Sequence, residues 1–191
     1  MLVAALLGAL SLHEYAHALA ADLQGDRLPR AMGRLSLNPA RHLDPIGTIA
    51  ILLIGFGWAK PVEFRMEALA SKRFGAAIVA LAGPMMNLAL AFAGGFLYGI
   101  FSPDGPRSLQ IFLFLFVRIN VILAVFNLIP LPPLDGSRLL TIFLPPHRQK
   151  VIFFLDRYGF LILLGLVFFA SEWLFDKLEP IFDFFIGIAG G

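Results

Sequence analysis

Residues 1–21 read MLVAALLGALSLHEYAHALAA, an apolar stretch that also carries two histidines and one glutamate. As a helix this stretch is long enough to cross the hydrocarbon core of a bilayer, which is about 30 Å thick. His13 and His17 are four residues apart, so their imidazoles lie one turn above each other on the same helix face. Unpaired ionisable groups inside a membrane are costly, so these side chains predict a functional site.

The pattern His13-Glu14-Tyr15-Ala16-His17 indicates a metal site. Two neutral imidazoles at this spacing can bind one zinc ion together, and the adjacent glutamate is placed to take a proton from water. The alternative to a metal site is that these side chains lie at a helix end and simply face water. Within a membrane segment the metal interpretation is favoured, because ionisable groups there are functional by default.

The composition indicates an integral membrane protein. Of the 191 residues, 59% are hydrophobic, and the mean hydropathy is +0.82. A soluble domain of this length could not bury so much apolar surface, which excludes a soluble enzyme. The chain has no cysteine, so nitrogen and oxygen atoms must bind any metal. The expected partner is the lipid bilayer, not nucleic acid.

Four apolar stretches are long enough to span a membrane, namely residues 1–21, 74–101, 109–129 and 151–170. The first is expected to be a retained helix rather than a signal peptide, because it lacks a basic n-region and a clear cleavage site. Residues 46–56 are too few to cross as a helix and predict a re-entrant or β-hairpin-like segment. Residues 181–191 are also short and are expected to rest at the membrane interface.

The predicted fold class is therefore a membrane all-α protein, a polytopic bundle of about four transmembrane helices with a re-entrant segment after the first. We expect one domain over residues 1–191, with a core in 1–140 and a C-terminal helix and tail in 151–191. Small residues in the first two helices predict that these helices pack closely together. Gly83-Pro84 is expected to kink or break the second helix and to free backbone carbonyls there.

The basic residues predict the orientation of the bundle. Residues 22–72 and 131–150 carry most of the lysines and arginines, whereas the charged residues of 171–191 are mostly acidic. The positive-inside rule then places both loops in the cytoplasm and both termini outside. His13 lies about 13 Å along its helix from the first loop, so we expect the site toward the cytoplasmic side of a bacterial plasma (inner) membrane.

A hydrolytic zinc site usually has three protein ligands, and the third is not obvious here. There is no glutamate between Ala18 and Asp44, and Ala20 and Leu23 stand where the metzincin extension needs Gly and His. The polar loop offers candidates that lie toward bulk water: Asp22, Asp26, His42 and Asp44.

Asp135 is the other candidate for the third ligand. Pro130, Pro132 and Pro133 end the third helix and predict an extended segment that leads to Asp135 at the cytoplasmic end. At membrane depth such a segment must be buried in protein or line a wet cavity. An ordinary turn would also explain an Asp-Gly pair, so both choices remain open from the residues alone.

Three short motifs occur in order: His13-Glu14-x-x-His17, then Gly83-Pro84-x-x-Asn87, then Asn127-x-x-Pro130-x-Pro132-x-Leu134-Asp135-Gly136. In this order, and on successive membrane segments, they resemble the site-2 protease family of intramembrane zinc metalloproteases. The resemblance covers roughly residues 6–140, including GRLSLNP at 33–39 and GWAKP at 57–61. The chain resembles a compact form of the family, without a PDZ-like insert or another accessory domain.

The resemblance implies a core of three helices and the roles of the site residues. It implies that His13, His17 and Asp135 bind one zinc ion and that Glu14 is the catalytic base. Asn87 and Asn127 would position the substrate or line the site. Among other polar residues, Arg118 in the third helix is expected to snorkel or to pair with a neighbour such as Asn120.

The implied function is hydrolysis of a peptide bond within or near a transmembrane segment of a membrane protein, as in regulated intramembrane proteolysis. A non-catalytic zinc-stabilised membrane scaffold is one alternative, and it would need the metal ligands but not Glu14. A metal-ion transporter is another, and it would be expected to offer several ligand sets along a path. The substrate and the oligomeric state are not indicated by the sequence.

Overall fold

The computed structural model describes residues 1–47, 59–101, 104–143 and 149–188. Four long helices occupy most of these ranges: α1 (Leu2–Leu23), α4 (Lys72–Phe101), α5 (Arg107–Asn127) and α7 (Gln149–Gly187). Short helical turns lie between them: α2 (Leu28–Ala31), η1 (Pro39–Arg41), η2 (Met66–Ala68) and α6 (Gly136–Phe143). The described residues form no β-strand, so the predicted all-α fold class is confirmed.

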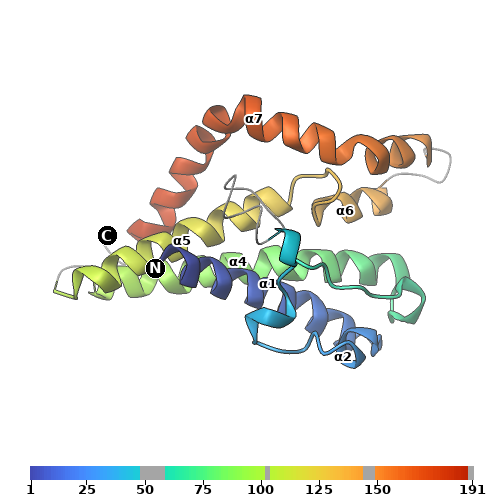
Figure 1. Ribbon diagram of the computed structural model, residues 1–191, viewed down its shortest axis with the longest axis horizontal. Helices are drawn as coiled ribbons and strands as arrows, with labels where there is room; N and C mark the ends of the chain where they lie inside the picture. Colours follow the sequence, from blue (N-terminus) through green and yellow to red (C-terminus); the bar gives the residue numbers. More distant parts are fainter. Residues whose placement is uncertain (48–58, 102–103, 144–148, 189–191) are drawn as a thin grey trace.

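Four helical segments are long and apolar enough to cross a membrane: Leu2–Leu23, Lys72–Phe101, Arg107–Asn127 and Lys150–Phe169. They lie within a few residues of the four predicted spans. In Figure 1, α1, α4 and α5 run beside one another, and α2 and α6 lie toward the same end of the bundle. The two loop regions rich in basic residues therefore share one end, and both termini lie toward the other.

The core consists of α1, α4 and α5, which all pack against one another. Ala5 and Ala9 of α1 are fully buried, and Ala76 and Ala80 of α4 are nearly so. Without a hydrophobic driving force between helices in lipid, small residues favour association because they allow the backbones to approach closely. The predicted packing of the first two spanning helices is thus confirmed.

Of the two outcomes predicted at Gly83-Pro84, a break of α4 does not occur, and a kink stays a prediction. The helix continues from Lys72 to Phe101 with Pro84 inside it. Pro84 has no backbone N–H, so it cannot donate a hydrogen bond to the carbonyl of Ala80, one turn before it. In a helix held on both sides by α1 and α5, tertiary packing compensates for one missing bond.

The C-terminal tail packs into the bundle, so the prediction of an interfacial tail is wrong for its described residues. α7 runs on through Pro180, and Phe182 and Phe185 are buried against Ala91 of α4 and against Val117 and Val121 of α5. Figure 1 shows α7 bent, with its last part returning to α5. The prediction treated residues 181–191 as a separate short segment, whereas the apolar face of a longer helix buries them.

The predicted re-entrant segment, residues 46–56, falls mostly outside the described residues. The chain on its two sides is held together by an isolated antiparallel bridge between Leu43 and Ala59. The backbone N–H of Lys60 also donates to the carbonyl of His42, over 2.8 Å. Arg34, which is 2% exposed, donates to the carbonyls of Arg41, Lys60 and Pro61. The two flanks of this segment therefore meet beside η1, which packs on α1.

Candidate metal centre

The HExxH side chains of α1 point into the bundle. His13, Glu14 and His17 are 4%, 8% and 5% exposed. The Nε2 atoms of the two imidazoles lie 3.0 Å apart, and the rings meet edge to face. The helical spacing of four residues thus brings two ring nitrogens to one point, as the sequence predicts.

Asp135 completes the group from the loop between α5 and α6. Its Oδ2 lies 3.1 Å from Nε2 of His13 and 3.1 Å from Nε2 of His17. Gly136 allows this tight loop, since a Cβ there would lie 2.4 Å from the carbonyl oxygen of Leu128.

The outer nitrogens of both imidazoles carry hydrogen. Nδ1 of His17 lies 2.7 Å from the carbonyl oxygen of Val79, which can only accept, so Nδ1–H donates. Nδ1 of His13 donates in the same way to Oδ1 of Asn87, over 2.5 Å. A neutral imidazole with hydrogen on Nδ1 presents a bare lone pair on Nε2. Three acceptor atoms therefore face one another, which is an arrangement that a cation satisfies.

This donor set fits zinc. The group of His13, His17 and Asp135 has one ligand atom each within 4.8 Å of the others, and it contains only nitrogen and oxygen donors. The separations of 3.0 and 3.1 Å are close to the roughly 3.3 Å expected between ligands bonded at 2.0–2.1 Å to a tetrahedral zinc ion. Hydrogen bonds to the outer nitrogens, as seen here, are the usual support of metal-binding histidines.

Gly83 leaves the space that the imidazoles occupy. A Cβ at this position would lie 2.6 Å from Cε1 and 2.7 Å from Nε2 of His13, closer than real Cβ atoms come to other atoms. α4 therefore packs its backbone directly against His13 and His17. A kink or break was the only role predicted for Gly83-Pro84, and the glycine itself was the one signal of this steric role.

The two asparagines of the motifs lie in different places. Asn87 is fully buried, and its side chain contacts His13 and Asn120, so it lines the site from behind His13. Asn127 is the last residue of α5 and is half-buried. Its Nδ2 donates to the carbonyl of Leu123 in the same helix, over 3.0 Å.

The loop alternatives for a third ligand lie elsewhere. Asp22 pairs with Arg27 and Arg30, and Asp26 pairs with Arg65. Oδ1 of Asp44 accepts from the backbone N–H of Gly47. His42 is buried, and its Nε2–H donates to the carbonyl of Ser36 over 2.6 Å. Among the described residues, the group that could hold a metal contains Asp135 and none of these four.

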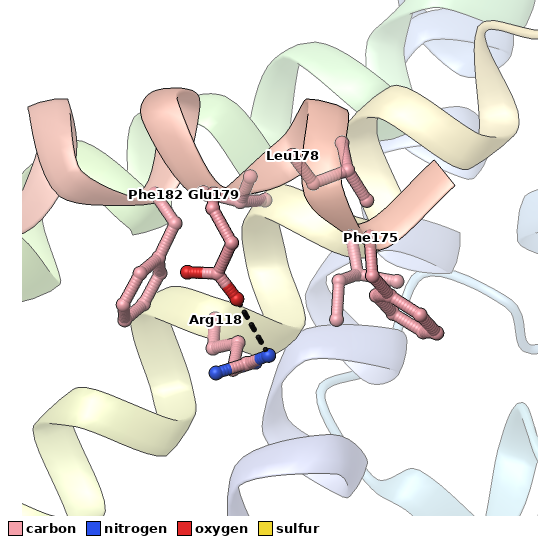
Figure 2. A pocket seen from close by; sticks show the side chains of 7 residues that line it. Arg118, Phe175, Leu178, Glu179 and Phe182 are labelled. Carbon is pink, nitrogen blue, oxygen red and sulfur yellow. Dashed lines mark hydrogen bonds and ion pairs between the residues drawn. The ribbon is translucent and has the colours of Figure 1, made fainter. Parts of the chain in front are cut away.

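Arg118 has a different partner from the one predicted. Its Nη2 lies 3.0 Å from Oε1 of Glu179 in α7, and its guanidinium lies 5.5 Å from the centre of the Phe182 ring. Figure 2 shows the two charged groups in contact beside a small cavity that both of them line. Asn120 faces α4 instead. The predicted topology placed Glu179 in an acidic stretch outside the membrane, so it was not considered as the partner of Arg118.

A family model and several curated relatives match the chain. The model of peptidase family M50 matches residues 1–108 and 105–166. "Putative zinc metalloprotease YwhC" of Bacillus subtilis is 40% identical over 172 residues, which cover 86% of this chain and 78% of the relative. "Putative zinc metalloprotease Rip2" of Mycolicibacterium smegmatis is 31% identical over 193 residues, which cover 96% and 73%.

A shorter match joins the chain to an archaeal protein. "Putative zinc metalloprotease MJ0611" of Methanocaldococcus jannaschii is 48% identical over 62 residues, which cover 32% of this chain and 31% of the relative. No solved structure matches the chain. The family model covers most of the sequence, and the apolar helices are those of an integral membrane protein. The chain therefore belongs to peptidase family M50, the site-2 protease family.

Proposed function

We propose that this protein is an intramembrane zinc metalloprotease that hydrolyses a peptide bond within or near a transmembrane segment of a membrane protein substrate, as in regulated intramembrane proteolysis. The proposal is carried by one observation. Nε2 of His13, Nε2 of His17 and Oδ2 of Asp135 converge at one point, and Glu14, the residue that follows His13 in α1, is buried. The zinc metalloprotease names of the relatives point in the same direction.

The proposed chemistry divides between the metal and Glu14. When bound by His13, His17 and Asp135, zinc would supply Lewis acidity toward a water and the scissile carbonyl. Glu14 is the proposed base: its carboxylate takes the proton of the attacking water as the new C–O bond forms. The same carboxyl then gives that proton to the leaving amine, whose protonation lets the C–N bond break.

The burial of Glu14 suits this role. The residue is 8% exposed and follows His13 directly in α1. A carboxyl without the metal group would be costly at this depth in a spanning helix. A helical substrate must unwind at the scissile bond, because its backbone hydrogen bonds shield each carbonyl. Asn127, at the end of α5, is the proposed substrate-binding residue on the approach to Asp135.

The proposed location is a bacterial plasma (inner) membrane, with the metal centre toward the cytoplasmic side. The basic residues of 22–72 and 131–150 support this orientation through the positive-inside rule. Both loop regions lie toward one end of the bundle in Figure 1, as a four-span topology requires. We also propose that residues 1–191 act as one domain, since α7 packs on α4 and α5 of the core.

The test is to measure zinc content and proteolysis together on the full chain purified in detergent. Zinc is counted in wild type, His17→Ala, Asp135→Ala and Glu14→Gln, and the same four proteins are given a transmembrane peptide. We expect about one zinc ion per chain in wild type and Glu14→Gln and little in the two ligand variants. Cleavage is expected from wild type alone.

Each component of the proposal can fail separately. Normal zinc content in Asp135→Ala would exclude this residue as the third ligand. Cleavage by Glu14→Gln at the wild-type rate would exclude Glu14 as the base. Wild type that binds zinc but cleaves no transmembrane peptide would favour a zinc-stabilised membrane scaffold.

A further inference from the structure

Asn120 is a polar side chain buried in the middle of α5. Asn120 and Asn87 are both 0% exposed, although each carries an amide with two donors and an acceptor. A polar group buried at this depth is costly unless it is fully hydrogen-bonded. Neither the metal ligand set nor the proposed base includes Asn120, so its presence calls for another explanation.

The backbone of α5 fixes the orientation of the Asn120 amide. Its Nδ2 lies 2.8 Å from the carbonyl oxygen of Phe116. A carbonyl can only accept, so the atom that faces it must be the NH₂ group. Oδ1 of Asn120 then points to α4, where it accepts from Nδ2 of Asn87 over 2.7 Å.

The orientation of Asn120 in turn fixes that of Asn87. Because Nδ2 of Asn87 donates to Asn120, its Oδ1 is the atom that lies 2.5 Å from Nδ1 of His13. An amide oxygen can only accept, so Nδ1 of His13 carries hydrogen. Nε2 of His13 is then the lone pair that faces His17 and Asp135.

The two histidines donate to different kinds of hydrogen-bond acceptor. His17 donates to the backbone carbonyl of Val79, which belongs to a helix and cannot reverse. His13 donates to a side-chain amide, which could turn over and present its NH₂ group to Nδ1. That rotation would favour the tautomer with hydrogen on Nε2, which blocks metal binding. Asn120 prevents the rotation, because a reversed Asn87 would set its oxygen against the oxygen of Asn120.

We propose that Asn120 is a positioning residue of the metal centre, which acts through Asn87 to hold His13 in its metal-binding tautomer. The hydrogen bonds run from α5 through α4 to α1, so one relay joins the three core helices to one ligand. The inference rests on the metal site of the proposed function but not on proteolysis.

The test is a double-substitution cycle on zinc affinity, measured by competition with a chelator on the full chain in detergent. Asn87→Leu and Asn120→Leu are each expected to weaken zinc binding by about 10–100-fold, the usual loss for a residue that supports a metal ligand. The double variant is expected to be no weaker than Asn87→Leu, because Asn120 acts only through that residue. Asn120→Asp is expected to retain affinity within about threefold when its carboxyl is protonated, because the O–H can donate to the carbonyl of Phe116 while the other oxygen accepts from Asn87.

Two further variants separate positioning from general damage. Asn120→Ser keeps a hydrogen bond to its own helix but cannot reach Asn87, so it should lose affinity even if Asn120→Leu does not fold. Val117→Ala truncates another fully buried α5 side chain that has no polar contact. It should lower the unfolding temperature and leave zinc affinity unchanged.

Several results would overturn the inference. Additive losses in the double variant would show that Asn120 does not act through Asn87. Wild-type zinc affinity in Asn120→Leu or Asn120→Ser would show that Asn120 does not hold His13 in its metal-binding tautomer. Wild type without zinc would refute both this inference and the proposed function. Zinc binding that follows the expected pattern without any cleavage would support the inference and refute the proposed function alone.

Discussion

Gly83 of α4 lies directly against His13 of α1, so close that a Cβ at position 83 would come 2.7 Å from Nε2 of the imidazole. A second helix thus delimits the ligand cluster with its backbone, and the metal centre is a contact between helices as much as a motif on one of them. The contact between Gly83 and His13 can be tested through zinc affinity, without a measurement of catalysis.

Gly83→Ala is expected to weaken zinc binding by at least about tenfold, because the added methyl displaces His13 and His17. Alanine is the better helix former by about 1 kcal/mol, so any loss cannot be assigned to helix propensity. Gly165→Ala is the matched control: it makes the same change in α7, where a Cβ meets nothing within 4 Å. Equal zinc affinity in both variants, measured by chelator competition, would contradict the steric role of Gly83.

α7 touches the loop that carries Asp135. Gly159 is buried, and a Cβ there would lie 2.5 Å from the carbonyl oxygen of Pro132. Gly159→Leu should push this loop away and lower zinc affinity by about tenfold, whereas Gly165→Leu should leave zinc affinity at the wild-type value. If Gly159→Leu binds zinc as wild type does, α7 does not support the loop that carries Asp135.

Because Arg118 and Glu179 form an ion pair, we expect the effects of replacing them on protein stability to be coupled. The two side chains are 40% and 47% exposed, so their net coupling should be modest, about 1 kcal/mol. Arg118→Leu and Glu179→Leu should each lower the unfolding temperature, because each leaves a charge without its partner. The double variant should recover part of this loss. Unfolding temperatures are measured in detergent. If the loss in the double variant equals the sum of the losses in the two single variants, the pair contributes nothing to stability.

The sequence predicted those features that depend on one segment at a time. Long apolar runs identified the four spans, and the spacing of His13 and His17 identified two ligands, because both signals are local. Asp135 lies 118 residues from His17, and only the order of the motifs connected them. From the residues alone, an ordinary turn explained Asp135 as well as a metal-ligand role did, and the polar residues of the first loop also remained possible.

The features that the sequence could not supply are contacts between segments. The tail at 181–187 is short by itself, and only α4 and α5 explain why Phe182 and Phe185 are buried. Asn87 and Asn120 are 33 residues apart, and neither side chain indicates its partner. A kink or break was expected at Gly83-Pro84, and the break does not occur, since local propensity does not include the packing that holds α4 on both sides.

Asp26 predicts a loss of stability in acid. Burial raises the pKa of its carboxyl, but hydrogen bonds from the backbone and guanidinium of Arg65 and from the N–H of Leu28 lower it further, so the net pKa is below the ordinary value. A carboxyl of this kind stabilises the fold above its unfolded pKa of about 3.9, and the contribution disappears as pH falls through the lower, folded value. Asp26→Asn should therefore unfold at a lower temperature than wild type at neutral pH, and the difference should shrink once the pH drops below about 4. Thermal unfolding in detergent over this range provides the measurement, with the exposed Asp104→Asn as the control that shows no such difference. A gap between wild type and Asp26→Asn that stays constant into strong acid would mean that Asp26 supports the loop by its hydrogen bonds alone and not by its charge.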